Sequence, residues 1–318
     1  MRLLVVGPRT TRVFDRVVKL TIPERRQEPE PPFVLPILAE DVVIDGPPGK
    51  YRFLASFERG AAAAGGETEF HLADPAEMPP VKHEVVLWGD DAELAKWLAE
   101  HGIRTRPFSP LPPPGEGPGV RASRREVILV SGKAPAPGGA AAFRVLASRI
   151  ASGCTVVFLT PEALAGDKSP TRWVPLRQKG SLGGIPRWLY LSDDWAKSHP
   201  IFDGLPAGGL LDYTVYRDII PDQVWSGQEP PAAAVAGANN VSCGYASGLT
   251  VAVYQFGAGR FVLNSLRVRE NLGTNPVAER LLRNLLRWAA EDLAQPLATL
   301  PADFDKQLQE LGLGDSAS

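Results

Sequence analysis

KHEVVLWGDDAELAKWLAEHGIRTRPF, residues 82–108, contains a strand, a polar turn and a helix in immediate succession. The apolar run Val85–Trp88 is typical of a buried strand. Gly89 and the two aspartates Asp90 and Asp91 supply a turn and candidate helix N-caps. The predicted helix ends at Gly102. Its apolar stripe consists of Leu94, Trp97 and Leu98. The stretch predicts the first unit of an α/β sheet.

Downstream segments continue this α/β pattern. EVILVSG (126–132) and CTVVFLTP (154–161) read as strands that are apolar on both faces, with a helix over 140–153 between them. Such strands belong in a sheet that is covered on both sides. A hairpin turning at 256–259 and an amphipathic helix within 275–293 complete the predicted domain.

Two polar segments within this region have weaker patterns. DDWAKSHP (193–200) resembles a helix start, so Asp193 and Asp194 are interpreted as N-cap residues. DYTVYRDIIP (212–221) reads as a strand because of its alternating apolar side chains.

The chain before Pro80 has a different periodicity. RVFDRVVKLTIP (12–23), KYRFLASFERG (50–60) and ETEFHLA (67–73) alternate with period two, and Pro/Gly clusters separate them. This pattern is typical of a small antiparallel β-sandwich of immunoglobulin-like type. We therefore predict three regions, listed by residue number: an immunoglobulin-like β-sandwich over 1–80, an α/β domain over 81–295 and a C-terminal tail over 296–318.

Composition excludes several classes of function. A net charge of -2 leaves no basic field for nucleic acid, and the four histidines never occur at metal-ligand spacing. Two cysteines cannot build a disulfide framework, and we expect no cofactor and no metal. The apolar run at the start is too short for a secretory signal, and no run reaches membrane-spanning length. We expect a soluble chain, without an assigned compartment.

The second region resembles the class I glutamine amidotransferase-like superfamily, which is flavodoxin-like in fold. The resemblance rests on VVLWGDDAELAKWLAEHGI, TVVFLTPEAL, SHPIFDGLP and GAGRFVLNSL followed by NPVAERLLRNLLRWAA. The stretch HPIFDGLP and the terminal helix are similar to the ThuA-like branch. The order of sandwich and α/β domain resembles the C-terminal region of bacterial family 2-type glycoside hydrolases of the β-galactosidase kind.

This resemblance implies an accessory region, because those hydrolases carry out catalysis in a TIM barrel. A barrel needs roughly 200 residues or more, and no stretch here offers its eight units. The implied partners are carbohydrate, a TIM-barrel domain or chain, and a second copy in a homo-oligomer; the chain is then an independent accessory protein or the end of a longer reading frame. The alternatives are a hydrolase acting on glycosidic or sugar-derived substrates, and a purely structural interaction domain.

No catalytic residues are predicted. Active members of the superfamily use a cysteine nucleophile, a histidine and an acid. Cys154 precedes its strand, Cys243 leads into a strand and not a helix, and no histidine follows His199. Cys154 is interpreted as a small buried hydrophobe.

The carboxyl edge of the α/β sheet carries the candidate ligand-binding residues, since ligands of open α/β sheets bind there. They are Trp88, Asp90, Asp91, Asn264, Arg267, Glu270 and Asn271. Where ThuA-like proteins have a Leu-Gly-His stretch, this chain has Leu266-Arg267-Val268. The alternative is structural: Arg267 and Glu270 pair with each other or cap the terminal helix, and Asp90 or Asp91 caps the helix after it.

Aromatic side chains form a third candidate group, because amphipathic rings often serve at binding surfaces. They are Trp173, Trp188, Trp195, Tyr213, Tyr216 and Trp225. Tryptophan and tyrosine are mostly part-buried in any protein. Both a carbohydrate platform and ordinary packing therefore remain open for them.

Overall fold

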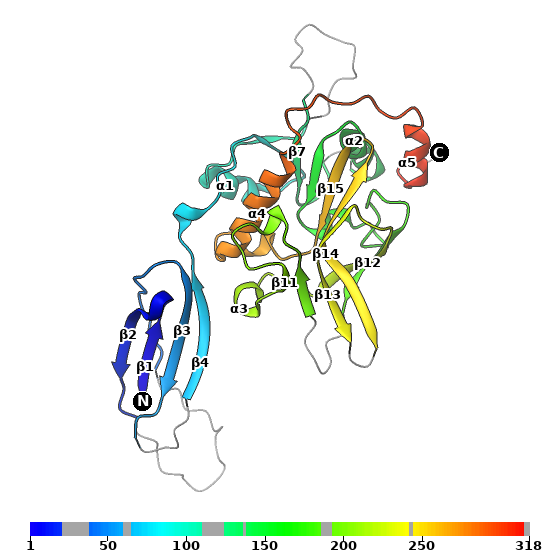
Figure 1. Ribbon diagram of the computed structural model, residues 1–318. Helices are drawn as coiled ribbons and strands as arrows, with labels where there is room; N and C mark the ends of the chain where they lie inside the picture. The colour runs from blue at the N-terminus through cyan, green and yellow to red at the C-terminus, as the bar shows by residue number, and fades with distance from the viewer. Residues whose placement is uncertain are drawn as a thin grey trace. The chain divides into compact units, whose positions relative to one another are not determined.

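The computed structural model describes residues 1–20, 38–59, 65–109, 124–135, 138–185, 193–241 and 244–314. The chain divides into two compact units, Met1–Glu77 and Met78–Ser318 (Figure 1). Each unit has its own sheet, so the protein combines an antiparallel sheet with a larger mixed α/β sheet.

The first unit contains a four-stranded antiparallel sheet in the order β2-β1-β3-β4. Its elements are β1 (Arg2–Val6), η1 (Pro8–Thr10), β2 (Arg12–Val17), β3 (Gly49–Ser56), β4 (Gly65–Leu72) and η2 (Pro75–Glu77). The three strands predicted from alternation are confirmed, and the apolar run at the start adds β1. Tyr51 is fully buried, stacks on Phe70 at 5.4 Å and donates its hydroxyl to the carbonyl oxygen of Pro47.

The second unit contains the mixed sheet. Its strands are β5 (Val85–Trp88), β6 (Thr105–Pro107), β7 (Val127–Val130), β8 (Thr155–Phe158), β9 (Lys179–Gly184), β10 (Asp193–Ala196), β11 (Gly209–Leu210), β12 (Gln223–Gln228), β13 (Ala233–Val241), β14 (Tyr245–Phe256) and β15 (Gly259–Asn264). Its helices are α1 (Ala92–Glu100), α2 (Gly139–Ala151), α3 (Tyr213–Tyr216), α4 (Pro276–Ala289) and α5 (Phe304–Glu310), with short turns η3 (Pro161–Leu164), η4 (Pro200–Phe202) and η5 (Arg269–Asn271).

The mixed sheet has a parallel half and an antiparallel half that meet at β15. The parallel half runs in the order β6-β5-β7-β8-β15. From β15 the sheet continues antiparallel through β14, β13, β10 and β11, and β12 joins β14 to β9. The hairpin predicted at residues 256–259 is confirmed as the β14–β15 turn.

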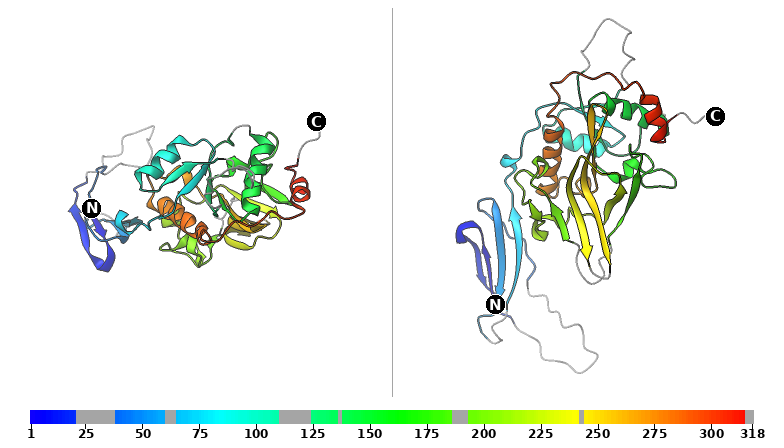
Figure 2. Two further views of the ribbon diagram at one scale, coloured as in Figure 1. Left: turned by 90° about the horizontal axis from the view of Figure 1, so that it is seen from above. Right: turned by 45° about the vertical axis from the view of Figure 1, so that its right-hand side comes forward.

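Helices cover both faces of the parallel half (Figures 1 and 2). Alternate side chains of β5 divide between two cores: Val85 faces the core that contains Leu94 of α1 and Leu281 of α4. Val86 faces the core that contains Leu146 of α2 and Phe304 of α5. The doubly apolar strands are therefore buried on both sides, as their sequence predicted.

Two local predictions are wrong. The segment at Asp193 begins strand β10 and not a helix, because its backbone pairs with β13 on one side and β11 on the other. The segment at 212–221 contains the short helix α3 and not a strand. Asp212 caps that helix by accepting hydrogen bonds from the backbone N–H and the hydroxyl of Thr214.

The predicted C-terminal tail contributes to the core. Phe304 and Leu308 of α5 are buried, and so are Leu311 and Leu313 beyond it. Arg144 of α2 donates a hydrogen bond to the carbonyl oxygen of Leu313 at 3.1 Å. The described part of this segment is therefore packed against α2.

Gly259 provides a test of how closely α2 approaches β15. A Cβ atom there would collide with the carbonyl oxygens of Ile150 and Cys154. We expect Gly259→Ala to lower the free energy of unfolding by about 1–3 kcal/mol, because the backbone at Ile150 and Cys154 must shift to make room for the methyl group. Gly183→Ala is the matched control, since nothing lies within 4 Å of its added Cβ. Urea unfolding measures both, and equal stabilities for the two variants would contradict the close approach.

Candidate functional site

Asp91 is the central polar residue at the carboxyl edge of the parallel strands. It is the N-cap of α1, where its Oδ1 accepts the backbone N–H of Leu94 at 2.9 Å. Its Oδ2 accepts the hydroxyl of Ser131, which follows β7, at 2.6 Å. The predicted capping role is confirmed, and the same carboxylate also links two loops of the edge.

Arg269 binds the Asp91 carboxylate through two hydrogen bonds of 2.7 Å each, from Nε and Nη2. Burial acts to raise the pKa of Asp91, but the hydrogen bonds from Arg269, Ser131 and the Leu94 N–H lower it to about 2. The hydrogen bonds between Arg269 and Asp91 also raise the pKa of Arg269, against the effect of burial. The two charges are therefore held as a bidentate ion pair, a geometry that fixes both groups.

The loops after β5 and β7 approach each other closely. A Cβ atom on Gly89 would collide with the carbonyl oxygen of Ser131. One on Gly132 would lie 2.7 Å from the carbonyl oxygen of Asp90, whose own N–H donates to the Lys133 carbonyl at 3.3 Å. The backbones of the two loops are thus in close contact, and the charge of Asp91 beside them is paired with Arg269.

The other residues predicted at this edge do not converge. Trp88 is 1% exposed and packs against Phe143, on the α2 side of the sheet. Asn264 is fully buried and donates to the carbonyl oxygens of Leu159 and Leu266. Both side chains are buried inside the unit and are not exposed at the edge.

The predicted residues after β15 either bond to backbone carbonyl oxygens or are exposed to solvent. Asn271 donates to the carbonyl oxygens of Asp218 and Arg267. The side chains of Arg267 and Glu270 are exposed, and no ion pair joins them within the described residues. The predicted pair is therefore wrong, and the ion pair of this segment is formed by Arg269 with Asp91. Asn275, not Arg267 or Glu270, caps α4.

Cys154, the cysteine that the structure describes, is a poor nucleophile. Cys154 is fully buried, and burial raises the pKa of its thiol to about 11. Cys243 lies outside the described residues. Among the residues that are described, no three His, Cys, Asp or Glu side chains gather as a metal site would require. No described helix is long and apolar enough to cross a membrane.

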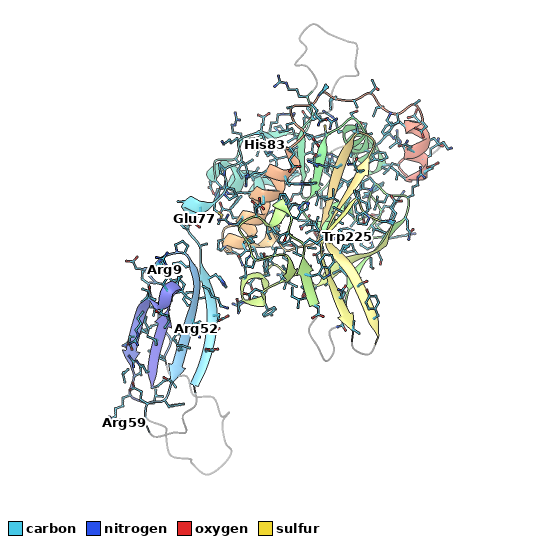
Figure 3. The ribbon with its side chains drawn as sticks, in the orientation of Figure 1. Arg9, Arg52, Arg59, Glu77, His83 and Trp225 are labelled. Carbon is cyan, nitrogen blue, oxygen red and sulfur yellow. The ribbon has the colours of Figure 1, made fainter. Side chains whose placement is uncertain are left out.

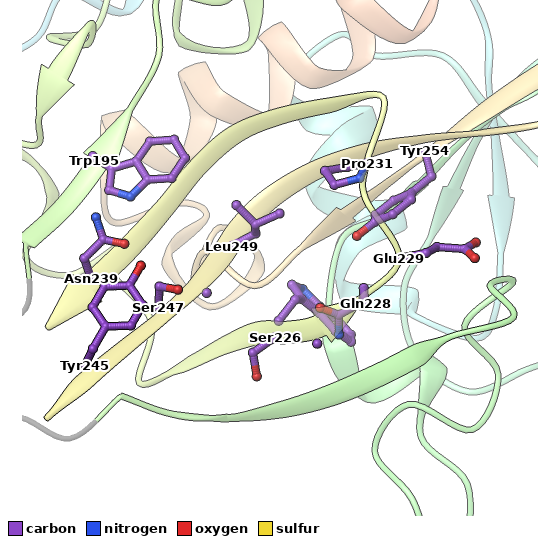
Figure 4. A pocket seen from close by; sticks show the side chains of 13 residues that line it. Trp195, Ser226, Gln228, Glu229, Pro231, Asn239, Tyr245, Ser247, Leu249 and Tyr254 are labelled. Atoms are coloured by element: carbon purple, nitrogen blue, oxygen red, sulfur yellow. The ribbon is translucent and has the colours of Figure 1, made fainter.

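A pocket of about 250 Å³ lies on the antiparallel half of the sheet (Figure 4). Its floor follows from strand register: Trp195 of β10 is opposite Gly237 of β13, and Gly237 is opposite Leu249 of β14. Leu249 is in turn opposite Trp225 of β12. Residues directly opposite in antiparallel strands share a face, so the two indoles and Leu249 form one row.

A second row continues the floor toward the β13–β14 turn. Asn239 of β13 is opposite Ser247 of β14, and both line the pocket. Figure 4 shows Trp195, Asn239 and Tyr245 at one end, and Pro231 and Tyr254 at the other. The pocket therefore combines aromatic rings with neutral polar side chains.

Two buried polar atoms in the pocket lining have no hydrogen-bond partner within the described residues: Trp225 Nε1 and the Tyr254 hydroxyl. Trp225 (Figure 3) is 1% exposed, and Tyr254 is 2% exposed. Burial, and then the charge of Glu229, raise the pKa of Tyr254 to about 12, so its hydroxyl stays protonated at neutral pH. An unsatisfied buried polar group costs about 1–3 kcal/mol, which a ligand that bonds to it recovers.

The structure divides the predicted aromatic group. Trp195 and Trp225 line the pocket, whereas Trp173 stacks on Phe143 at 5.1 Å. Tyr216 is fully buried and donates its hydroxyl to the Pro206 carbonyl; Tyr213 is 56% exposed. Trp188 lies outside the described residues.

Sequence reasoning missed several pocket residues, which are Gln228, Glu229, Asn239, Tyr245, Ser247 and Tyr254. They come from β12, β13, β14 and the loop after β12. Alternation within one strand indicates which side chains share a face, but not which residues of another strand lie opposite. The sequence therefore contained no signal that joins them.

The Asp91–Arg269 pair predicts a pH dependence of stability. Because the folded pKa of Asp91 is lowered to about 2 from an unfolded value of about 3.9, its stabilisation is complete above about pH 4 and is lost toward pH 2. We expect Asp91→Asn to lower the free energy of unfolding by about 1–3 kcal/mol at pH 7. That difference should shrink as the pH falls from 4 toward 2, measured by urea unfolding.

Glu93→Gln is the matched control for this prediction. Glu93 pairs with the same arginine at 3.2 Å, but its side chain is 92% exposed. Exposed ion pairs contribute about 0–1 kcal/mol, so we expect a change near the lower end of that range. A stability gap for Asp91→Asn that is the same at pH 7 and pH 2.5 would contradict the electrostatic explanation.

Comparison with known proteins adds no family assignment. Neither protein-family models nor curated protein sequences give a match to this chain.

Proposed function

We propose that the chain is a non-catalytic, carbohydrate-binding accessory region of a glycoside hydrolase of the β-galactosidase kind. The observation that carries the proposal is the pocket of β10, β12, β13 and β14, where Trp225 Nε1 and the Tyr254 hydroxyl are buried without partners. Its ligand is a sugar, and its role is to hold that sugar for chemistry performed by a TIM-barrel domain or chain.

The pocket offers partners for both kinds of group on a sugar ring, the C–H groups and the hydroxyls. Pyranose C–H groups pack on aromatic faces, and the pocket offers the rings of Trp195 and Tyr245. Sugar hydroxyls both donate and accept hydrogen bonds. The indole N–H of Trp225 can only donate, and the Tyr254 hydroxyl can do both.

The lining is also held in place before any ligand binds. The amide nitrogen of Gln228 donates to the carbonyl oxygens of Lys179 and Ser181 at 3.1 and 3.0 Å. These bonds fix β12 against β9, and β12 carries Trp225. Preorganisation of this kind lowers the entropic cost of binding.

The carboxylates at the two candidate sites favour sugar binding over sugar hydrolysis. Glycosidases use a pair of carboxyl groups flanking the scissile bond. Glu229 is the single carboxylate among the described residues that line the pocket. Asp91, at the other candidate edge, is already bound by Arg269 and Ser131. Among the described residues, the pocket therefore lacks the pair of carboxyl groups that the hydrolase alternative requires.

Strand order supports the finer fold assignment that we propose with this function. The parallel strands, numbered along the chain from β5, have the order 2-1-3-4-5, which is the flavodoxin-like order. Helices on both faces agree with it. For the first unit we propose an immunoglobulin-like domain, supported by its antiparallel four-stranded sheet and its buried Tyr51.

Binding of sugars tests the proposal directly. We expect neutral methyl pyranosides, in gluco and galacto configurations, to bind the purified chain with millimolar affinity or better in calorimetric titration. Tyr245→Ala should weaken binding by roughly tenfold, since a stacked ring contributes about 0.5–1.5 kcal/mol beyond the burial of its area.

Tyr213→Ala is the matched control, because Tyr213 is also an exposed tyrosine, at 56% against 73% for Tyr245, but lies outside the pocket lining. Its variant should bind like the unchanged chain. Absence of binding by every pyranoside, or equal losses in the two variants, would refute the proposed function.

A further inference from the structure

Trp195 lines a second pocket, of about 300 Å³, in addition to the one already described. We infer that the two pockets form one extended site whose ligand is a neutral oligosaccharide of at least two sugar residues, passing over the Trp195 ring. This inference rests on the proposed function, and it adds the length and charge class of the ligand.

The position of the Trp195 indole is fixed by the strand beside it. Gly237, its cross-strand partner, has no side chain, and a Cβ atom there would lie 2.7 Å from Cζ2 of the indole. The ring therefore lies directly against the backbone of β13. The indole is half-buried and lines both pockets, so it can serve as an aromatic platform for a sugar.

The second pocket continues the site beyond β10. It is lined by Lys197 and Ser198 of the chain after β10, and by Gly208 and Gly209 at β11. A Cβ atom on Gly209 would meet nothing within 4 Å, so this side of Trp195 stays open. A single pyranose that occupies the first pocket leaves this neighbouring space unfilled, whereas a linked second residue can enter it.

The charges of the lining favour a neutral chain. Glu229 lines the first pocket and Lys197 lines the second, and they are the charged side chains among the described residues of the two linings. One negative and one positive charge leave the combined site without net charge. A polyanionic saccharide would place a carboxylate near Glu229, which is unfavourable.

Chain length provides the test. Calorimetric titration compares neutral gluco- and galacto-oligosaccharides of one, two and four residues with an oligouronate of four residues. For the unchanged chain we expect the affinity to rise roughly tenfold from one residue to two, because a second ring gains its own contacts. The oligouronate should bind more weakly than the neutral tetrasaccharide.

Three variants distinguish the contributions of the two pockets to binding. Trp195→Ala should remove the gain with length, and the double variant Lys197→Ala/Ser198→Ala should reduce that gain. Tyr254→Phe, in the first pocket only, should weaken all lengths by the same factor. Urea unfolding of each variant verifies that it is folded, and Trp195→Leu replaces Trp195→Ala if the latter is not.

The outcomes distinguish the two proposals. If monosaccharides bind but affinity does not rise with length, or if the rise survives Trp195→Ala, the extended site is wrong and the proposed function stands. A preference for the oligouronate overturns the neutral ligand class alone. If no saccharide of any length binds, the proposed function itself fails.

Discussion

The pairing of β15 with two different kinds of neighbour is the constraint on which the second unit depends. On one side β15 pairs parallel with β8, and on the other it pairs antiparallel with β14. The parallel strands are covered by helices on both faces, whereas the antiparallel strands carry the open pocket. One strand thus joins a fully buried half of the sheet to a half that retains an accessible face, as the two kinds of sheet commonly do.

The two candidate sites differ in what satisfies their polar groups. At the carboxyl edge, Asp91 already has Ser131, Arg269 and the Leu94 N–H as partners. In the antiparallel pocket, the buried Trp225 N–H and Tyr254 hydroxyl have none among the described residues. Buried polar groups in folded proteins are nearly always bonded. The Asp91 carboxylate at the edge is satisfied by the chain and is structural, whereas a pocket that leaves two polar groups of its lining unsatisfied is suited to a ligand.

Sequence reasoning was accurate where one segment determines its own structure. The strand at Val85–Trp88 and the Asp91 cap follow from local pattern, as does the turn before β15. It was wrong at Asp193, where pairing with β13 overrides the helix-like start, and at Tyr213, where the Asp212 cap overrides the apparent alternation. The Arg269–Asp91 pair was missed because the two residues lie 178 positions apart.

By itself, the sequence determined the class of the second unit, since apolar strands alternating with amphipathic helices can be buried only as a sheet covered on both sides. It also predicted no cysteine–histidine–acid triad, because neither cysteine begins a helix and no histidine follows His199. Only the tertiary structure decided which residues form the pocket. Trp195, Gly237 and Trp225 come together through the register of separate strands. Register is set by packing and by main-chain pairing across the whole sheet, and no single stretch of sequence contains it.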